Sequence, residues 1–155
     1  MTRASRLIGA LAIALLAIVS AGAYLGLDRL YRERARLRLA PFGLEVYRSQ
    51  NKGVPAESSP TLVVIGVSRI AMWEPEPNVT SHRLLWRGIG GQTSVQVLGR
   101  FDQDVVALRP TAVLVAVGIN DLMAAAAVHA STDVDQRIVQ NILRMADAAR
   151  SQNVV

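Results

Sequence analysis

The chain has 155 residues, of which 51% are hydrophobic, and this length and composition allow one domain with a sizeable buried core. Its formal net charge of +5 is unevenly spread, because residues 1–52 hold nine basic and three acidic residues and the remaining 103 residues carry a net charge of −1. A nucleic-acid-binding domain is not expected, since its basic patch should lie on the globular part.

Side chains that form disulfides or bind metals are scarce. The chain has no cysteine, which excludes disulfides and thiolate metal sites. His82 and His129 are the only histidines, and they lie too far apart in the sequence to form a typical metal-binding motif. We therefore expect no metal and no cofactor.

The first segment, residues 1–27, has the pattern of a membrane span. Residues 7–27 carry no charge and follow Arg3 and Arg6, and about 20 apolar residues are enough to cross a bilayer. We expect an N-terminal transmembrane helix that anchors the chain through residues 7–27. A signal peptide cleaved after Ala23 is the alternative, because small residues at 21–23 suit a cleavage site.

Residues 28–60 are expected to connect this span to a folded domain. Arginines alternate with apolar residues from Asp28 to Leu39, which predicts a basic juxtamembrane helix in solvent or beside lipid headgroups. Residues 49–60 are mostly polar and predict a linker. The excess of arginine after the span would, by the positive-inside rule, place the following domain in the cytoplasm.

Residues 61–155 read as an α/β domain. Apolar, β-branched runs predict strands at 62–65, 82–86 and 111–117, and helical spacing predicts helices at 68–73, 93–108 and 133–150. Two prolines within 74–78 predict a loop, and Val154–Val155 has the pattern of the start of a fourth strand. Strands that alternate with helices predict a parallel sheet covered on both faces.

Three polar or glycine-rich blocks follow the predicted strands. Ser68 follows the first strand, Gly91 lies in the glycine-rich block after the second, and Asn120 follows the third. Each has an ordinary structural explanation, as a helix cap, a tight turn and a turn-forming residue. However, the carboxyl ends of parallel strands meet at one edge of a sheet, where a nucleophile and two oxyanion donors would form an acyl-transfer site.

These blocks resemble those of the SGNH (GDSL-type) hydrolases, whose pattern is G-D-S, a glycine block, G-x-N-D and finally D-x-x-H. The resemblance spans about residues 61–155. It implies a three-layer α/β/α flavodoxin-like fold and a serine esterase that hydrolyses ester-linked acyl or acetyl groups of a small molecule, lipid or glycan at the cell envelope. It also implies that Ser68 is the nucleophile, that Gly91 and Asn120 form the oxyanion hole, and that the domain lies on the extracytoplasmic side.

The sequence departs from the family pattern at two places. Val67 stands where the family has aspartate, and neither His82 nor His129 has an aspartate three residues before it, so the D-x-x-H block is absent. A serine without an adjacent base is a poor nucleophile. We therefore interpret residues 61–155 as a C-terminally truncated SGNH domain whose hydrolase activity is lost or impaired.

Two other functions fit parts of the sequence. A catalytically dead, membrane-tethered domain that binds acyl groups or carbohydrate would explain Val67 and the missing histidine block. A nucleotide- or phosphate-binding module could use the glycines at 88–91, although the chain lacks the Lys-Ser/Thr of a P-loop and the G-x-G-x-x-G spacing. Asn78-Val79-Thr80 fits a glycosylation acceptor, a short match that is common by chance.

Overall fold

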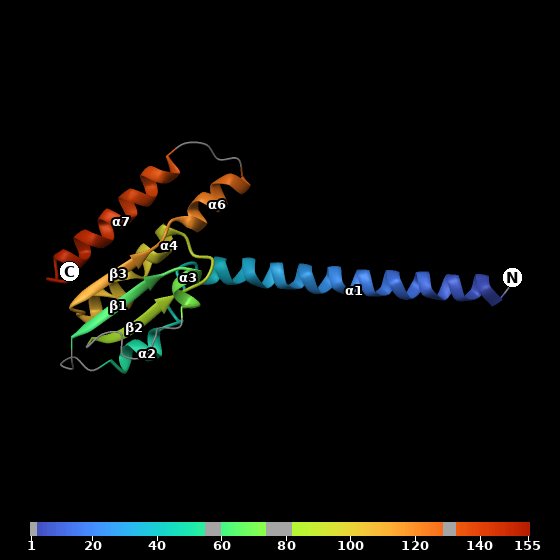
Figure 1. Ribbon diagram of the computed structural model, residues 1–155, viewed down its shortest axis with the longest axis horizontal. Coiled ribbons are helices and arrows are strands. Elements are labelled where there is room, and N and C mark those ends of the chain that lie inside the picture. The colour runs from blue at the N-terminus through green and yellow to red at the C-terminus, as the bar shows by residue number, and fades with distance from the viewer. Residues whose placement is uncertain (1–2, 55–59, 74–81, 129–132) are drawn as a thin grey trace. The chain divides into compact units, whose positions relative to one another are not determined.

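The computed structural model describes residues 3–54, 60–73, 82–128 and 133–155 (Figure 1). The chain divides into two compact units, Met1–Pro41 and Phe42–Val155. The expected loop at 74–78 and the glycosylation motif at 78–80 lie outside the described residues. The two units are described separately below.

The first unit consists mainly of one continuous helix, α1 (Arg3–Leu39). Its 37 residues span about 55 Å at 1.5 Å per residue. The stretch Ile8–Arg36 has a window of mean hydropathy 2.3, of which no residue is buried. By length and composition α1 is able to cross a membrane, and a signal sequence has the same properties. The N-terminus is therefore an exposed apolar helix of the kind found in signal sequences and membrane anchors.

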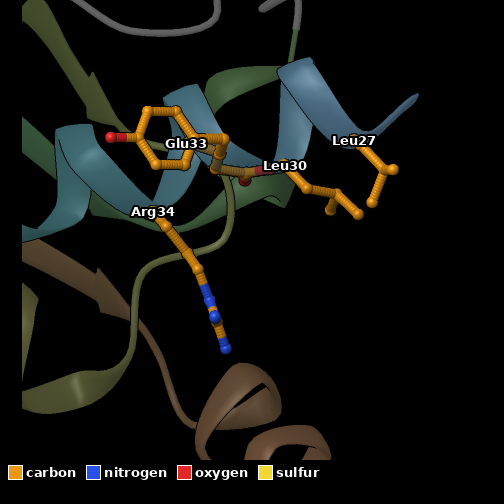
Figure 2. A pocket seen from close by; sticks show the side chains of 5 residues that line it. Leu27, Leu30, Glu33 and Arg34 are labelled. Carbon is orange, nitrogen blue, oxygen red and sulfur yellow. The ribbon is translucent and has the colours of Figure 1, made fainter. Parts of the chain in front are cut away.

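The C-terminal part of α1 changes from apolar to charged within about one turn. Figure 2 shows Leu27 and Leu30 projecting from the same stretch of helix as Glu33 and Arg34. An ion pair one turn apart, Arg32 Nε to Asp28 Oδ2 at 2.7 Å, also lies in this part. Arginines in the last turn of α1 suit the negative end of the helix dipole. This arrangement agrees with the expected basic helix after the apolar span.

The second unit is built on a parallel sheet in the order β2–β1–β3. The strands are β1 (Thr61–Gly66), β2 (Arg83–Gly88) and β3 (Ala112–Ala116), and Figure 1 shows them side by side. Gly66 lies opposite Gly88 on one side and Ala116 on the other, so the carboxyl ends of all three strands lie at one edge. The three predicted strands are confirmed. The strand order reverses between β1 and β3, which is where ligands bind in sheets of this type.

One face of the sheet carries the main core. Val63 and Ile65 of β1 pack there with apolar residues of α4 (Ser94–Gly99), α5 (Phe101–Asp104) and α7 (Val134–Arg150). On the other face lies α3 (Ser68–Ala71), whose Ile70 is buried against Gly66. Leu114 of β3 keeps 42% of its surface exposed. The expectation that both faces are covered therefore holds over β1 but not, among the described residues, over β3.

The helix predicted at 93–108 is wrong as a single element. The segment forms α4, α5 and the 3₁₀ helix η1 (Val106–Leu108) instead. Arg100 breaks the first helix, because its backbone (φ −112°, ψ 3°) is not helical. Val105 breaks the second in the same way, with φ −129° and ψ −68°. These breaks turn the Arg100 side chain into the interior, where it is fully buried. The apolar spacing was compatible with one helix because all three pieces bury the same face.

Two further helices lie where the sequence predicts none. α2 (Arg48–Lys52) occupies part of the segment assigned to a linker, and α6 (Ile119–Ala127) follows the G-x-N-D block. The linker prediction is wrong for residues 49–52, because Asn51 donates a hydrogen bond from Nδ2 to Asp104 Oδ1 at 2.7 Å and so belongs to the globular unit. Polar composition misled the prediction, since these polar side chains bind partners within the fold.

The last described residue pairs with the edge of the sheet. Val155 N donates to Thr111 O at 3.1 Å, and Val113 N donates to Val155 O at 2.8 Å. This alternation is the hydrogen-bond pattern of a parallel pair. Val155 therefore lies beside β3 as the expected fourth strand would, and the neighbouring Val154 side chain joins the core.

Candidate functional site

Ser68 is the first residue of α3, and the single residue Val67 separates it from the end of β1. The extended backbone of Val67 (φ −104°, ψ −153°) turns its side chain into the core, where it is 2% exposed. Ser68 itself is half-buried. Among the described residues its hydroxyl makes no hydrogen bond. Ser68 thus stands at the carboxyl edge of the sheet with a hydroxyl that no described side chain orients.

The glycine turn, residues 88–93, passes close to this serine. A Cβ atom at Gly88 would lie 2.1 Å from the backbone nitrogen of Ala71, so only glycine allows β2 to end against α3. A Cβ atom at Gly90 would lie 3.8 Å from Ser68 Cβ. The structure therefore places Gly90 close enough to Ser68 that a methyl group at Gly90 would touch the serine side chain.

Gly91 needs glycine because of its backbone conformation. Its φ of +77° lies in the left-handed region, and a Cβ atom there would meet no described atom within 4 Å. Gly91 is also exposed. The reason for glycine is the positive φ.

Asn120 is joined to the glycine turn by a hydrogen bond. Gly118, with φ +112°, turns the chain from β3 into α6, and Asn120 lies in the first turn of that helix. Its Nδ2 donates to the carbonyl oxygen of Gln92 at 2.8 Å. The structure thus brings the three predicted segments together, since Ser68 lies near Gly90 and Asn120 donates a hydrogen bond to Gln92 of the same turn.

Asp121 fastens the same block to α4, and the sequence analysis assigns it no role. Its carboxylate accepts hydrogen bonds from Ser94 N at 2.8 Å and Ser94 Oγ at 2.6 Å. Asn141 of α7 donates to Ser94 Oγ at 2.9 Å. A carboxylate at the beginning of α4 satisfies backbone N–H groups that have no partner within the helix. The acidic residue that follows Asn120 is the sequence feature from which this cap could have been predicted.

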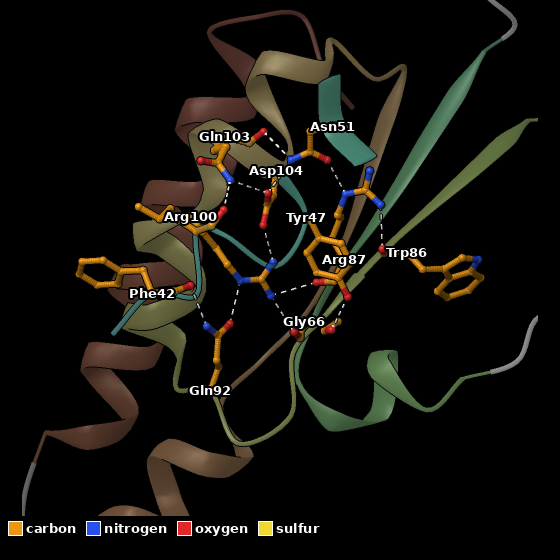
Figure 3. A network of polar contacts seen from close by, with 12 residues as sticks. Phe42, Tyr47, Asn51, Gly66, Trp86, Arg87, Gln92, Arg100, Gln103 and Asp104 are labelled. Carbon is orange, nitrogen blue, oxygen red and sulfur yellow. Dashed lines mark hydrogen bonds and ion pairs between the residues drawn. The ribbon is translucent and has the colours of Figure 1, made fainter. Parts of the chain in front are cut away.

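The carboxyl ends of β1 and β2 rest on buried charges. We call Arg100, Asp104 and Gln92, with the carbonyls of Gly66 and Arg87, the Arg100 network (Figure 3). Arg100 Nη1 pairs with Asp104 Oδ2 at 2.9 Å, and neither side chain is exposed. Spacing alone could not identify this pair, because an i, i+4 pair of opposite charges is also typical of an exposed helix.

Burial and neighbouring charges act in opposite directions on this network. Burial lowers the pKa of Arg100, and the hydrogen bond and charge of Asp104 oppose that shift. Burial also lowers the pKa of Arg87, again opposed by Asp104. Tyr47, whose hydroxyl donates to Gly88 O, has its pKa raised by burial. Every buried side-chain polar atom in the described part of the chain has a hydrogen-bond partner.

The two histidines do not join the described site. His82 precedes β2, at the opposite edge of the sheet from Ser68; the five residue steps from Arg83 to Gly88 span about 17 Å. His129 lies outside the described residues. Within the described ranges no cluster of three His, Asp or Glu side chains is placed to hold a metal ion. The described part of the site therefore contains the candidate oxyanion donors and a hydroxyl but no imidazole.

An open pocket of about 570 Å³ begins next to these blocks. Thr93 and Asp121, which directly follow Gln92 and Asn120, form part of its lining. Small apolar side chains of α4 and α6 and polar or basic side chains of α7 complete it: Val95, Ala124, Ala125, Val128, Val134, Arg137, Gln140, Asn141 and Arg144. The pocket offers an apolar wall beside the site, with guanidinium groups on its α7 side.

No protein-family model matches the sequence, and no curated protein sequence matches it. Solved structures do match. A protein from Bacteroides fragilis NCTC 9343 assigned as an acylhydrolase has a TM-score of 0.62 at 28% identity, over 73% of this chain and 54% of its own. A GDSL-like lipase from Bacteroides thetaiotaomicron VPI-5482 has a TM-score of 0.60 at 25% identity, over 73% and 55%.

The structure supports the SGNH (GDSL-type) hydrolase family. A lipolytic protein of the G-D-S-L family from Desulfitobacterium hafniense DCB-2 also matches, with a TM-score of 0.51 over 62% of this chain and 56% of its own. At 22% identity, this match shows a common fold only. The chain spans about half the length of these three SGNH-type proteins. The resemblance inferred from the three sequence blocks is thereby confirmed at the level of fold and family.

Proposed function

We propose that this chain carries the acyl-transfer site of an SGNH-type serine esterase, with Ser68 as nucleophile and Gly91 and Asn120 as oxyanion donors. The observation that carries the proposal is the convergence of three separate blocks at one sheet edge. A Cβ atom at Gly90 would lie 3.8 Å from Ser68 Cβ, and Asn120 Nδ2 donates to Gln92 O at 2.8 Å within the same turn. Structural similarity to an acylhydrolase and a GDSL-like lipase supports the choice of ester substrates.

The chemistry of such a site is a two-step acyl transfer. Ser68 Oγ bonds to the ester carbonyl carbon while its proton passes to a base, and the carbonyl oxygen becomes an oxyanion. The backbone N–H of Gly91 and the second N–H of Asn120 Nδ2 donate hydrogen bonds to that oxyanion. Collapse of the intermediate breaks the bond to the alcohol, which leaves with a proton, and water then releases the acyl group from Ser68.

The substrate is proposed to present an acyl chain to the pocket between α4, α6 and α7. Its apolar wall suits aliphatic carbon, because burying each CH₂ group gains about 0.8 kcal/mol. We further propose that α1 remains as a membrane anchor and holds the second unit on the extracytoplasmic side, near acylated lipids or glycans of the cell envelope. The exposed apolar surface of α1 supports an anchor.

Active-site labelling tests this function directly. The full chain, in detergent micelles, is treated with a fluorophosphonate, which forms a Ser68 Oγ–P bond with loss of fluoride. Because no described imidazole lies beside Ser68, labelling should be slow, but intact mass should increase by one phosphonyl group and Ser68→Ala should abolish the increase. Ser151→Ala is the matched control, because its hydroxyl donates to Ala148 O and is remote from the three blocks. Labelling that persists in Ser68→Ala would overturn the proposal.

A binding domain without catalysis is the second candidate, favoured by one observation. His82 is remote from Ser68, so the histidine that the structure describes is not placed to act as its base. This function predicts that a medium-chain acyl ester binds to the full chain without turnover, and that its binding is lost in Ala125→Trp, which fills the pocket. Release of the alcohol from this ester by the full chain would reject this candidate and favour the esterase.

A further inference from the structure

Arg100 makes an unusually complete set of contacts for a buried cation. Its Nη2 donates to Gly66 O at 3.0 Å and to Arg87 O at 2.9 Å, and its Nε donates to Gln92 Oε1 at 2.7 Å. Nη1 pairs with Asp104 Oδ2. Figure 3 shows the guanidinium pointing from its helix break toward the ends of β1 and β2.

These partners lie in two of the three segments that form the candidate site, the end of β1 before Ser68 and the end of β2 with the glycine turn. Gly66 stands two residues before Ser68, and Arg87 is the penultimate residue of β2. Gln92 directly follows Gly91, and its backbone oxygen accepts the Asn120 hydrogen bond. One planar guanidinium therefore contacts the ends of β1 and β2 and also Gln92, the residue that joins the glycine turn to Asn120.

The far side of Gln92 is also fixed. Its Nε2 donates to Phe42 O at 2.9 Å, so both ends of the side-chain amide are engaged. Gln92 is 5% exposed although it lies in a turn between two exposed or half-buried neighbours. A turn residue whose side chain is buried in this way cannot shift without breaking the hydrogen bonds at both ends.

Burying a charge is costly unless it is paired and hydrogen-bonded, and removing one partner leaves the other uncompensated. Here Asp104 balances Arg100 and is itself held by Asn51 Nδ2 at 2.7 Å. An aliphatic residue would fill the same interior without that cost. An aliphatic side chain would not make the hydrogen bonds that join Arg100 to Gln92, Gly66 and Arg87, so these bonds suggest why a cation lies there.

We propose that Arg100 is a positioning residue, which sets the geometry of the oxyanion donors through Gln92 and the strand ends. Its catalytic consequence rests on the proposed esterase function, whereas its effect on the glycine turn does not. Lysine cannot replace it, because an ammonium group lacks the planar fork that reaches Gln92, Gly66 and Arg87 at once. Arginine is required here for its shape as well as for its charge.

The test compares Arg100→Lys with a control in the same network. Arg87→Met removes the bonds of that guanidinium to Asn51 and Trp86 but leaves the Arg87 carbonyl and all contacts of Arg100 in place. Hydrogen exchange is followed by mass spectrometry on the full chain in micelles. The amide of Ile89, which donates to Gly66 O at 3.0 Å, reports on the start of the glycine turn.

Arg100→Lys should speed exchange in the peptide containing Ile89 at least tenfold, while Arg87→Met should change it less than threefold. With a fluorophosphonate, the labelling rate at saturating probe should fall 10- to 100-fold in Arg100→Lys, and the half-saturating concentration should change less than threefold. Equal exchange in the two variants would overturn the proposal, and so would a loss confined to probe affinity.

A second variant covers the case in which Arg100→Lys does not fold. Gln92→Met leaves the Arg100–Asp104 pair and its two carbonyl contacts in place but disconnects the glycine turn. It should reproduce the faster exchange and the slower labelling, and unchanged values for both would overturn the proposal. If the wild-type chain is not labelled at all, the esterase function fails, and the exchange comparison still decides the role of Arg100.

Discussion

The two sides of the candidate site differ in how firmly the fold holds them. On the oxyanion side, Gln92 is 5% exposed and binds Arg100, Phe42 and Asn120, so the residues around Gly91 are fixed by buried hydrogen bonds. On the nucleophile side, Ser68 begins a four-residue helix, and its hydroxyl has no hydrogen-bond partner among the described residues.

The fold of the described residues fixes the candidate oxyanion side, but it does not orient the Ser68 hydroxyl. The candidate oxyanion donors Gly91 and Asn120 come from two segments, the glycine turn and the start of α6, which a hydrogen bond from Asn120 to Gln92 joins. Among the described residues, no side chain hydrogen-bonds to the Ser68 hydroxyl as a proton acceptor would. Preorganised donors and an activated nucleophile are therefore independent properties, and variants can test each of them separately.

The largest effect is expected from removing the Asn120 amide. Asn120→Ala should slow fluorophosphonate labelling of Ser68 about 100- to 1000-fold, the usual loss for one oxyanion donor. Gln152→Ala is the control, because it removes an exposed side-chain amide that belongs neither to the pocket lining nor to the three blocks. The control should stay within about threefold of wild type. Equal rates for Asn120→Ala and wild type would exclude Asn120 from the oxyanion hole.

Restoring the family aspartate should destabilise the nucleophile side. Val67 is 2% exposed and packs in the core, so the carboxyl group of Val67→Asp would be buried without an assigned partner. We expect a loss of about 3 kcal/mol in the free energy of unfolding, measured by urea denaturation. Val139→Asp, at a position 54% exposed, should cost less than about 1 kcal/mol. An unchanged midpoint for Val67→Asp would show that this turn readily accepts a carboxylate.

A smaller effect is expected at the glycine turn. Gly91→Ala keeps the space around the residue but forces a side chain into the left-handed region, at a cost of about 1 kcal/mol. Gly53→Ala is the control, because φ there is −87° and a Cβ atom would make only an ordinary contact of 3.6 Å. The free energies of unfolding of the two variants, obtained from their denaturation curves, should differ by about this cost. Equal midpoints would mean that the turn adopts a different conformation in solution.

The smallest effect is expected from His82→Ala. Because His82 precedes β2, whose five residue steps to the site edge span about 17 Å, labelling of Ser68 should stay within about twofold of wild type between pH 6 and pH 9. Rates measured across this range give a direct comparison of the two profiles. A rise in rate with pH that is present in wild type and lost in the variant would show that His82 is the base after all.

The sequence predicted the strands well because β1 and β3 are apolar runs rich in valine, and β2 contains a short apolar run that ends at the glycine block. It placed Ser68, Gly91 and Asn120 at one edge for the same reason, since parallel strands end together. It could not predict the break at Arg100, because apolar spacing records which face is buried and not where a helix is interrupted. Nor could composition show that Asn51 binds a buried carboxylate, because hydrogen bonds between residues 53 positions apart leave no local pattern.

The Arg100 network also has a consequence for sequence change. The Arg100 guanidinium donates to Gly66, Arg87 and Gln92 together. The losses in free energy of unfolding from substitutions at Arg100 and Gln92 should therefore not be additive. Once either residue is replaced, the other loses its partner, and a second replacement costs less than it would alone. Arg100, Asp104 and Gln92 should therefore be inherited as a set, with each one constraining which residues the others can become.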